Sequence, residues 1–206
     1  MDTKQTVLPY WPLWAAAQFA STDEAKKMLT YVHVFQDADT IQIESTDGHR
    51  AFRYRIPRPS NFHIDGDELM IAAATIKKQV SYGKYVTVED PRVDHEITIW
   101  GGKRDACERI TTYHERKPHG YTYPNINQLW PDSFSNAPES SFAFNTRYIK
   151  EIAAVMDKLG SNCIMKFYGN APTTPWVITS SYEPRFGDHA DRPVLEVLIM
   201  PVQVRD

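Results

Sequence analysis

The sequence predicts an α+β fold in which a helix and the antiparallel strands after it form a unit that occurs three times. Helix-like apolar segments occur near the start, before the middle and in the last third of the chain. Each is followed by segments in which apolar and polar residues alternate. The units recur about every 50 residues, which suggests internal duplication. We therefore expect the helices to pack on one face of the sheets.

The first unit begins with a helix that is expected to be buried. Pro12 suits a first helical position, and residues 13–20 are apolar nearly all round. Alternation with period two over residues 31–56 then predicts three short antiparallel strands. In the last of them, Arg53 and Arg55 lie opposite the apolar side chains.

The second unit begins near residue 67. Apolar residues at helical spacing predict an amphipathic helix that ends near Gly83, and alternation predicts strands at 85–89 and 96–100. Residues 101–141 are richer in Gly, Pro, Asn, His and Ser, so they are interpreted as one more strand and a long connector.

The third unit begins with a helix at residues 145–159, which has apolar residues on one face and Gly160 as its stop signal. Strands are expected after it at 163–168, 176–180 and 194–200.

Length and composition restrict the class of protein. The 206 residues, divided by about 150 per domain, give roughly 1.4 domains. With 42% hydrophobic and 24% charged residues the chain is expected to fold alone. Its apolar runs are short and its first residues are not in the order of a signal peptide, so we expect neither a membrane protein nor a secreted one. Cys107 and Cys163 lack metal-ligand spacing, which favours a reducing, cytoplasmic location. A net charge of −3 argues against a surface that is basic throughout and is compatible with one basic face.

Three matches are more specific than these patterns. The first is residues 21–34 and 41–51, which include TDGHR at 46–50; the second is YTYPN at 121–125; and the third is at the end, FNTRYI at 144–149 with LIMPV at 198–202. In this order they resemble bacterial sliding clamps, the beta subunit of DNA polymerase III. The matching parts of that family are its middle domain, the connector to its last domain, its last helix and its C-terminal tail. Asn125 stands where the family's connector has an aspartate.

The resemblance implies a DNA-clamp-like fold made of three half-modules, whereas the family has three domains of two halves each. The implied domains are residues 1–133, a clamp-like domain of two half-modules with the connector, and residues 134–206, a single half-module. Residues 132–144 are too few to hold a further helix and three strands. One and a half domains fit the length of the chain.

The resemblance also implies a cleft for partner peptides, which three distant segments would line. Its positions fall on Thr46, His49, Arg50, Ala51, Pro124, Leu129, Leu198, Met200, Pro201 and Val202. Small apolar and proline residues can accept Leu or Phe anchors of an extended peptide, and methionine adapts to varied partners. His49 and Arg50 are expected to bond peptide carbonyls at the rim. The alternative is that Leu198 and Met200 only finish an edge strand and that Pro124 is a turn residue.

A basic stripe is expected to face DNA. The second helix region offers Lys77, Lys78 and Lys84, and the third helix offers Arg147, Lys150 and Lys158. Such residues can contact phosphates without reading sequence, which sliding requires. The alternative is a solvated charged face, because Glu151 and Asp157 dilute the stripe.

The sequence is compatible with two functions. The first is a sliding-clamp-like DNA replication accessory protein, a processivity factor that binds duplex DNA and peptides of a DNA polymerase or clamp loader. If a ring needs the family's twelve helices, three per chain imply a tetramer, and closed symmetry allows such a homo-oligomer. The alternative is a non-encircling clamp-like module that binds or sequesters replication proteins. Neither needs a cofactor, a membrane or catalysis.

A third class of function would be an enzyme or a metal site. Two groups contain possible ligands: Cys107, His114 and His119, and then Asp188, His189 and Asp191. Neither group has the spacing of a zinc site, and the chain has no phosphate-binding loop and no nucleophile elbow. The aromatic residues Tyr10, Trp11 and Trp14 indicate either a buried helix or an exposed subunit contact.

Overall fold

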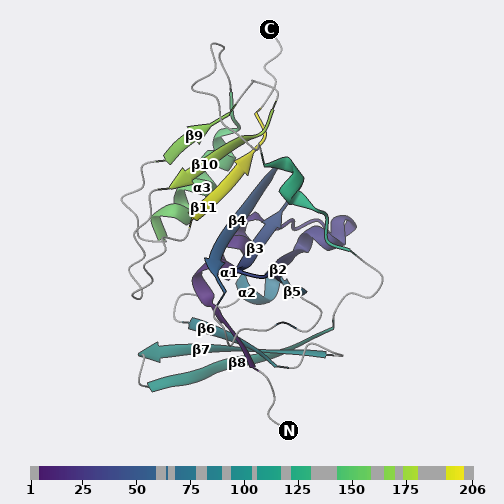
Figure 1. Ribbon diagram of the computed structural model, residues 1–206, viewed down its shortest axis with the longest axis vertical. Helices are drawn as coiled ribbons and strands as arrows, with labels where there is room; N and C mark the ends of the chain where they lie inside the picture. Colours follow the sequence, from purple (N-terminus) through teal and green to yellow (C-terminus); the bar gives the residue numbers. More distant parts are fainter. Residues whose placement is uncertain are drawn as a thin grey trace.

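The computed structural model describes residues 5–58, 64, 68–77, 83–89, 94–103, 106–116, 122–130, 143–158, 165–169, 174–180 and 194–201. Two antiparallel sheets form its framework (Figure 1). The first has the strand order β1 (Gln5–Pro9), β6 (Gly83–Glu89), β7 (Asp94–Lys103) and β8 (Ala106–Arg116). The second has the order β5 (Glu68–Ala72), β2 (Tyr31–Gln36), β3 (Thr40–Thr46), β4 (Arg50–Pro57), β11 (Val194–Ile199), β10 (Trp176–Ser180) and β9 (Met165–Tyr168).

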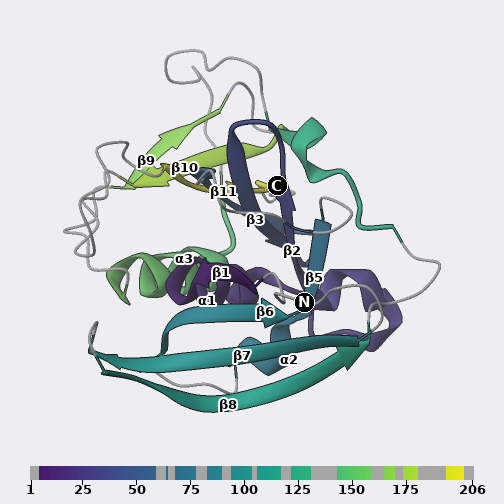
Figure 2. The same ribbon diagram turned by 60° about the horizontal axis from the view of Figure 1, so that its bottom comes forward.

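The α-helices lie against the inner faces of these sheets. They are α1 (Tyr10–Phe19), α2 (Ala73–Lys77) and α3 (Thr146–Lys158), and two 3-10 helices, η1 (Glu24–Thr30) and η2 (Ile126–Leu129), accompany them. Figure 2 shows α1 between the two sheets, with α3 beside it beneath β10 and β11. The predicted α+β class, with helices packed on the sheets, is confirmed.

The apolar composition of α1 follows from its position. Seven of its ten residues are buried, and the side-chain hydroxyl of Tyr10 donates to the backbone oxygen of Ile76 at 3.3 Å, which ties α1 to α2. The helix begins before Pro12, which is tolerated because backbone N–H groups in a first turn have no intrahelical acceptor. The prediction of a buried first helix is therefore confirmed.

The strand predictions from alternation are also confirmed. The segment 31–56 forms β2, β3 and β4, and its inward residues enter one large apolar core together with the buried face of α3. The strands at 85–89 and 96–100 correspond to β6 and β7, the strand before the connector is β8, and the last three are β9, β10 and β11.

The helix predicted from residue 67 is wrong in its first part, because residues 68–72 form strand β5. Leu69 and Ile71 enter the main core, whereas Met70 between them enters a second apolar cluster on the opposite face of the sheet. In a strand that is buried on both faces, the apolar residues can have the same spacing as one face of a helix. Here residues 68–72 form a strand because they pair with β2. The described part of the helix is α2, Ala73–Lys77.

Two leading strands connect the first two units. Strand β1, which the sequence patterns do not predict, pairs with β6 of the second unit, and β5 pairs with β2 of the first. Each unit therefore contributes its leading strand to the other unit's sheet.

The third unit extends the sheet of the first. Strand β11 pairs with β4 over residues 194–199, so the seven-stranded sheet includes residues from both sides of the expected boundary at 133/134. The division into 1–133 and 134–206 stays a prediction. Within the described ranges, no helix combines the length and the apolar character needed to cross a membrane.

Candidate partner groove and helix-side pocket

The β3–β4 hairpin is part of the seven-stranded sheet, and its side chains reach both faces of that sheet. On the surface that we call the connector face, residues 122–130 cover the strands, and Ala51 and Leu198 are buried there with Tyr123 and Ile126. On the opposite helix face, α1 and α3 cover the strands. Side chains alternate between these faces along each strand, so neighbours in the sequence belong to different surfaces.

The hairpin turn explains why the TDGHR segment has these residue types. Gly48 has a φ of 92°, which L side chains rarely adopt. The Thr46 hydroxyl donates to the Arg50 backbone oxygen at 2.8 Å and accepts from the Gly48 N–H at 3.0 Å. One Asp47 carboxylate oxygen accepts from the backbone N–H groups of His49 at 2.9 Å and Arg50 at 3.0 Å. The turn is therefore held by its own side chains.

The structure brings the hairpin, the connector and the tail together. Ala51 pairs with Leu198 across β4 and β11, and the Met200 N–H donates to the backbone oxygen of His49 at 3.2 Å. Leu129 is 44% exposed and Met200 is 39% exposed. Of the remaining predicted cleft residues, Pro124 is exposed, Pro201 is half-buried, Thr46 is buried, and Val202 lies outside the described residues.

The connector is attached to the sheet by buried polar groups. The Asn127 side-chain oxygen accepts from Gln42 Nε2 at 2.9 Å and from Arg53 Nη1 at 3.1 Å. The Arg53 guanidinium lies 4.2 Å from the ring centre of Trp130 and donates from Nε to Glu196 at 2.7 Å. Burial lowers the pKa of Arg53, and the carboxylate of Glu196 opposes this shift.

Asn125 caps the N-terminus of η2 in the connector. Its side-chain oxygen accepts from the Asn127 N–H at 3.2 Å at the start of η2. An aspartate at this position could accept the same bond, so the departure from the family's pattern preserves the turn.

Arg50 lies on the helix face, away from the apolar part of the predicted cleft. Its Nη2 is 2.7 Å from Glu151 Oε2 on α3, and it also donates to the backbone oxygen of Gln18 on α1 at 3.3 Å. The guanidinium is therefore already bonded within the chain. His49 is exposed at the turn, where its ring stacks with Tyr148 at 6.1 Å between centroids.

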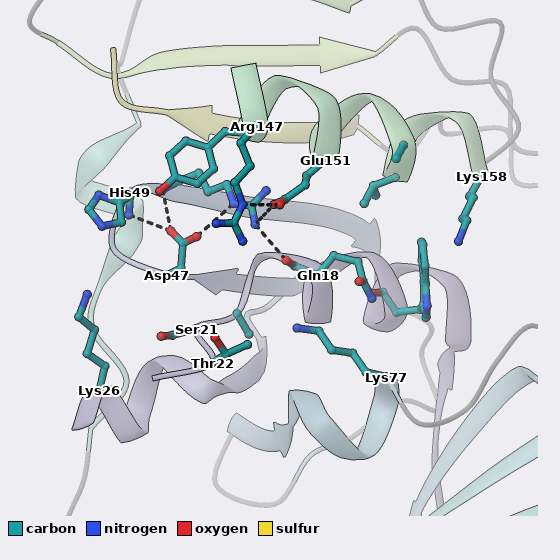
Figure 3. A pocket seen from close by; sticks show the side chains of 16 residues that line it. Gln18, Ser21, Thr22, Lys26, Asp47, His49, Lys77, Arg147, Glu151 and Lys158 are labelled. Carbon is teal, nitrogen blue, oxygen red and sulfur yellow. Dashed lines mark hydrogen bonds and ion pairs between the residues drawn. The ribbon is translucent and has the colours of Figure 1, made fainter. Parts of the chain in front are cut away.

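A pocket of about 540 Å³ opens on the helix face between α1, α2, α3 and the hairpin (Figure 3). Three of the residues predicted to face DNA line it: Lys77, Arg147 and Lys158. Lys150 lies on the exposed side of α3, Lys84 belongs to β6 in the other sheet, and Lys78 is outside the described residues. The basic stripe thus divides into pocket residues and residues elsewhere.

The cations of the pocket differ in their surroundings. Arg147 is exposed, and its ion pair with Glu151, 3.0 Å from Nε to Oε1, raises its pKa. Lys77 is half-buried, and burial together with the nearby charge of Arg50 lowers the pKa of its ammonium. Lys158 places its ammonium 4.9 Å from the ring centre of Trp14.

Sequence reasoning did not place several of the residues that line this pocket in a common site, namely Trp14, Gln18, Lys26, Tyr148 and Glu151. The available signal was the spacing of Trp11, Trp14 and Gln18, which places them on one stripe of α1 that is less buried than the rest of the helix.

Neither suggested metal group is supported within the described ranges, which hold no cluster of three or more possible ligands. Cys107 and His114 lie on β8. The other suggested ligands, His119, Asp188, His189 and Asp191, are outside the described residues.

The chain matches no model of a protein family, and no curated protein matches its sequence. Its fold matches solved bacterial clamps. The beta chain of DNA polymerase III from Streptococcus pneumoniae has a TM-score of 0.67 and 14% identity, with 99% of this chain and 66% of that chain covered. The sliding clamp from Bacillus subtilis has a TM-score of 0.67 and 14% identity, with 99% and 65% covered. The beta clamp of H. pylori has a TM-score of 0.69 and 12% identity, with 99% and 68% covered.

This chain therefore spans about two thirds of the length of the clamp chains that it matches. Its fold is that of part of the bacterial DNA polymerase III beta chain, as the sequence segments predicted.

Proposed function

We propose that this chain, which has the fold of part of a bacterial sliding clamp, is a non-catalytic accessory protein of DNA replication. In this proposal it binds peptides of replication partners on the connector face and encircles duplex DNA as an oligomer, and it works in the cytoplasm. The meeting of the hairpin, the connector and the tail around exposed Leu129 and Met200 carries the proposal.

The connector face offers what an extended peptide needs. Leu129 and Met200 are two of the three large hydrophobic side chains that are exposed in the described part of the chain, and Phe167 is the third. Both belong to segments packed on buried Ala51 and Leu198. An apolar anchor of a peptide placed there would therefore contact an ordered apolar surface. We propose that Thr46, Pro124, Pro201 and Val202 border this groove.

Loss of the exposed groove residues should weaken peptide binding. A labelled peptide with Leu and Phe anchors in the clamp-binding pattern is titrated by fluorescence anisotropy. Leu129→Ala combined with Met200→Ala should cost about 1–3 kcal/mol, because truncating interface anchors typically has this effect. Phe167→Ala is the matched control, since it removes an equally exposed apolar side chain from β9.

Two results would count against the groove. One is no binding up to millimolar peptide. The other is an equal loss in the Phe167→Ala control, which would show that general surface apolarity, rather than this groove, binds the peptide.

The cations on the helix side support contact with duplex DNA. Arg147, Lys150 and Lys158 project from α3, and we propose that they contact phosphates together with Lys77, Lys78 and Lys84. Phosphate contacts carry no sequence information, so they would allow a ring to move along the duplex.

Ring closure predicts both a mass and a topological effect. Light scattering at micromolar protein should give a multiple of the chain mass, four chains if the ring has twelve helices. Protein mixed with nicked circular plasmid and purified at high salt should stay on the circle, because a topological link does not depend on phosphate contacts. Linearising the same plasmid should release it. A monomer, or equal retention on both forms, would exclude encircling.

A second candidate is the non-encircling module that binds or sequesters replication proteins. One observation favours it: the helix-side stripe of α1 presents Trp11, Trp14 and Gln18 and no cation. A monomer that binds the peptide and fails the plasmid test would identify this function.

A further inference from the structure

The helix-side pocket combines aromatic and cationic side chains. Trp14 and Tyr148 line it together with Lys26, Arg50, Lys77, Arg147 and Lys158, against two carboxylates, Asp47 and Glu151. The chain as a whole has a net charge of −3, so this concentration of positive charge is local. The pocket therefore has a charge complementary to an anionic ligand.

Lys77 is a cation of this pocket that is half-buried and has no partner within the described part of the chain. Its side chain reaches from α2 into the pocket beneath Gln18 (Figure 3), and it is half-buried. It has no hydrogen-bond or ion-pair partner among the residues that the structure describes, whereas Arg50 and Arg147 both contact Glu151. A half-buried ammonium without a partner loses hydration that a phosphate oxygen would replace.

Trp14 adds a stacking surface beside these cations. It lines the pocket and contacts Trp11 edge to face at 5.6 Å between centroids. The ammonium of exposed Lys158 lies over the Trp14 ring, so a base that stacks on this face would displace the ammonium toward the neighbouring phosphates. Base stacking on an aromatic ring next to phosphate-binding cations is how proteins bind single strands without sequence preference. A duplex cannot use this surface in the same way, because its bases are stacked on one another.

We propose that this pocket binds single-stranded DNA, with one base stacked on Trp14 and the neighbouring phosphates held by Lys77, Lys158 and Arg147. The pocket volume of about 540 Å³ is within the range of about 300–1,000 Å³ that small ligands occupy, so it accommodates a nucleotide unit. The site shares Lys77, Lys158 and Arg147 with the proposed duplex contacts, but it adds base stacking on Trp14 and requires neither the peptide groove nor a closed ring.

The test is a titration of a labelled oligothymidine of about ten nucleotides, followed by anisotropy and by tryptophan fluorescence. Binding should quench tryptophan emission. If three phosphates are neutralised, the plot of log K against log salt should have a slope of about −2. Lys77→Met, which keeps an apolar stem, should weaken binding about fivefold or more and reduce the slope to about −1.4.

A matched control separates the pocket from general attraction. Lys27→Met removes the same charge from the exposed surface of η1, outside the pocket, and should change affinity less than about twofold. Trp14→Leu should weaken binding about fivefold or more, whereas Trp14→Phe should retain most of it, because an aromatic face is preserved. The Phe variant also gives a readout if the Leu variant does not fold.

Three results would overturn the proposal. They are a duplex of equal length that binds as tightly as the single strand, an equal loss in Lys77→Met and Lys27→Met, and thymidine monophosphate that binds as tightly as the oligomer. The last would assign the pocket to free nucleotides. The peptide titration uses the other face of the sheet, and the plasmid test detects a topological link that does not depend on phosphate contacts. Failure of this proposal is therefore distinguishable from failure of the proposed function.

Discussion

Replacing Arg50 by methionine is expected to lower the free energy of unfolding by about 3 kcal/mol. The Arg50 side chain is 7% exposed and joins three elements: the hairpin through Asp47, α3 through Glu151, and α1 through the Gln18 backbone oxygen. Methionine fills the same space but leaves both carboxylates without this cation. The loss should lie at the lower end of about 3–5 kcal/mol, because Glu151 is 37% exposed and regains water.

Urea denaturation of the variant measures this loss, and Arg147→Met provides the control. Arg147 pairs with the same Glu151 carboxylate, 3.0 Å from Nε to Oε1, but it is 79% exposed. Its removal should shift the urea midpoint much less than Arg50→Met does, since solvent screens an exposed pair. Equal losses in the two variants would show that burial of Arg50 contributes nothing, and that the guanidinium does not connect the hairpin to the helices.

Local patterns were sufficient to predict most of the fold. The alternation in residues 31–56 gave β2, β3 and β4, because one face of each strand meets the core and period two reports this directly. The amphipathic pattern at 145–159 gave α3 within one residue at each end for the same reason. In these elements, residues close together in the sequence determine whether a strand or a helix forms.

Elements that depend on distant partners were not predictable in this way. Strand β1 is paired with β6, and β5 takes its strand conformation from pairing with β2. The spacing of apolar residues from Leu69 fits a helix or a strand buried on both faces, and only the partner strand distinguishes them. Such pairing is a property of the assembled sheet.

In the candidate site, too, some features follow from local residues and others only from the tertiary structure. The TDGHR hairpin could be assigned from its own residues, because Gly48 and the side chains beside it hold the turn. The convergence of Lys77, Arg147 and Lys158 on one pocket could not, since α2 and α3 meet only in the tertiary structure. Lys84 has the right charge but belongs to the other sheet.

The role of Arg53 could not be predicted from the sequence, and its replacement is expected to cause a large loss of stability. Alternation correctly places it opposite the apolar core, yet the connector covers that face. Arg53→Met is expected to lower the free energy of unfolding by about 3–5 kcal/mol, because Glu196 and Asn127 lose the guanidinium that joins them. Partial burial of Glu196 gives its carboxylate little compensating water.

Arg55→Met is the matched control for this variant, since Arg55 lies two residues further along β4 on the same face. Its side chain is exposed and donates from Nε to Gln42 at 2.7 Å, so its removal should cost less than about 1 kcal/mol in urea denaturation. Arg53→Met should also expose residues 122–130 to limited proteolysis and weaken peptide binding, because Leu129 is carried by the connector. If Arg53→Met and Arg55→Met unfold at the same urea concentration, and the connector stays protected in both, the apolar contacts of Tyr123, Ile126 and Trp130 alone hold the groove together.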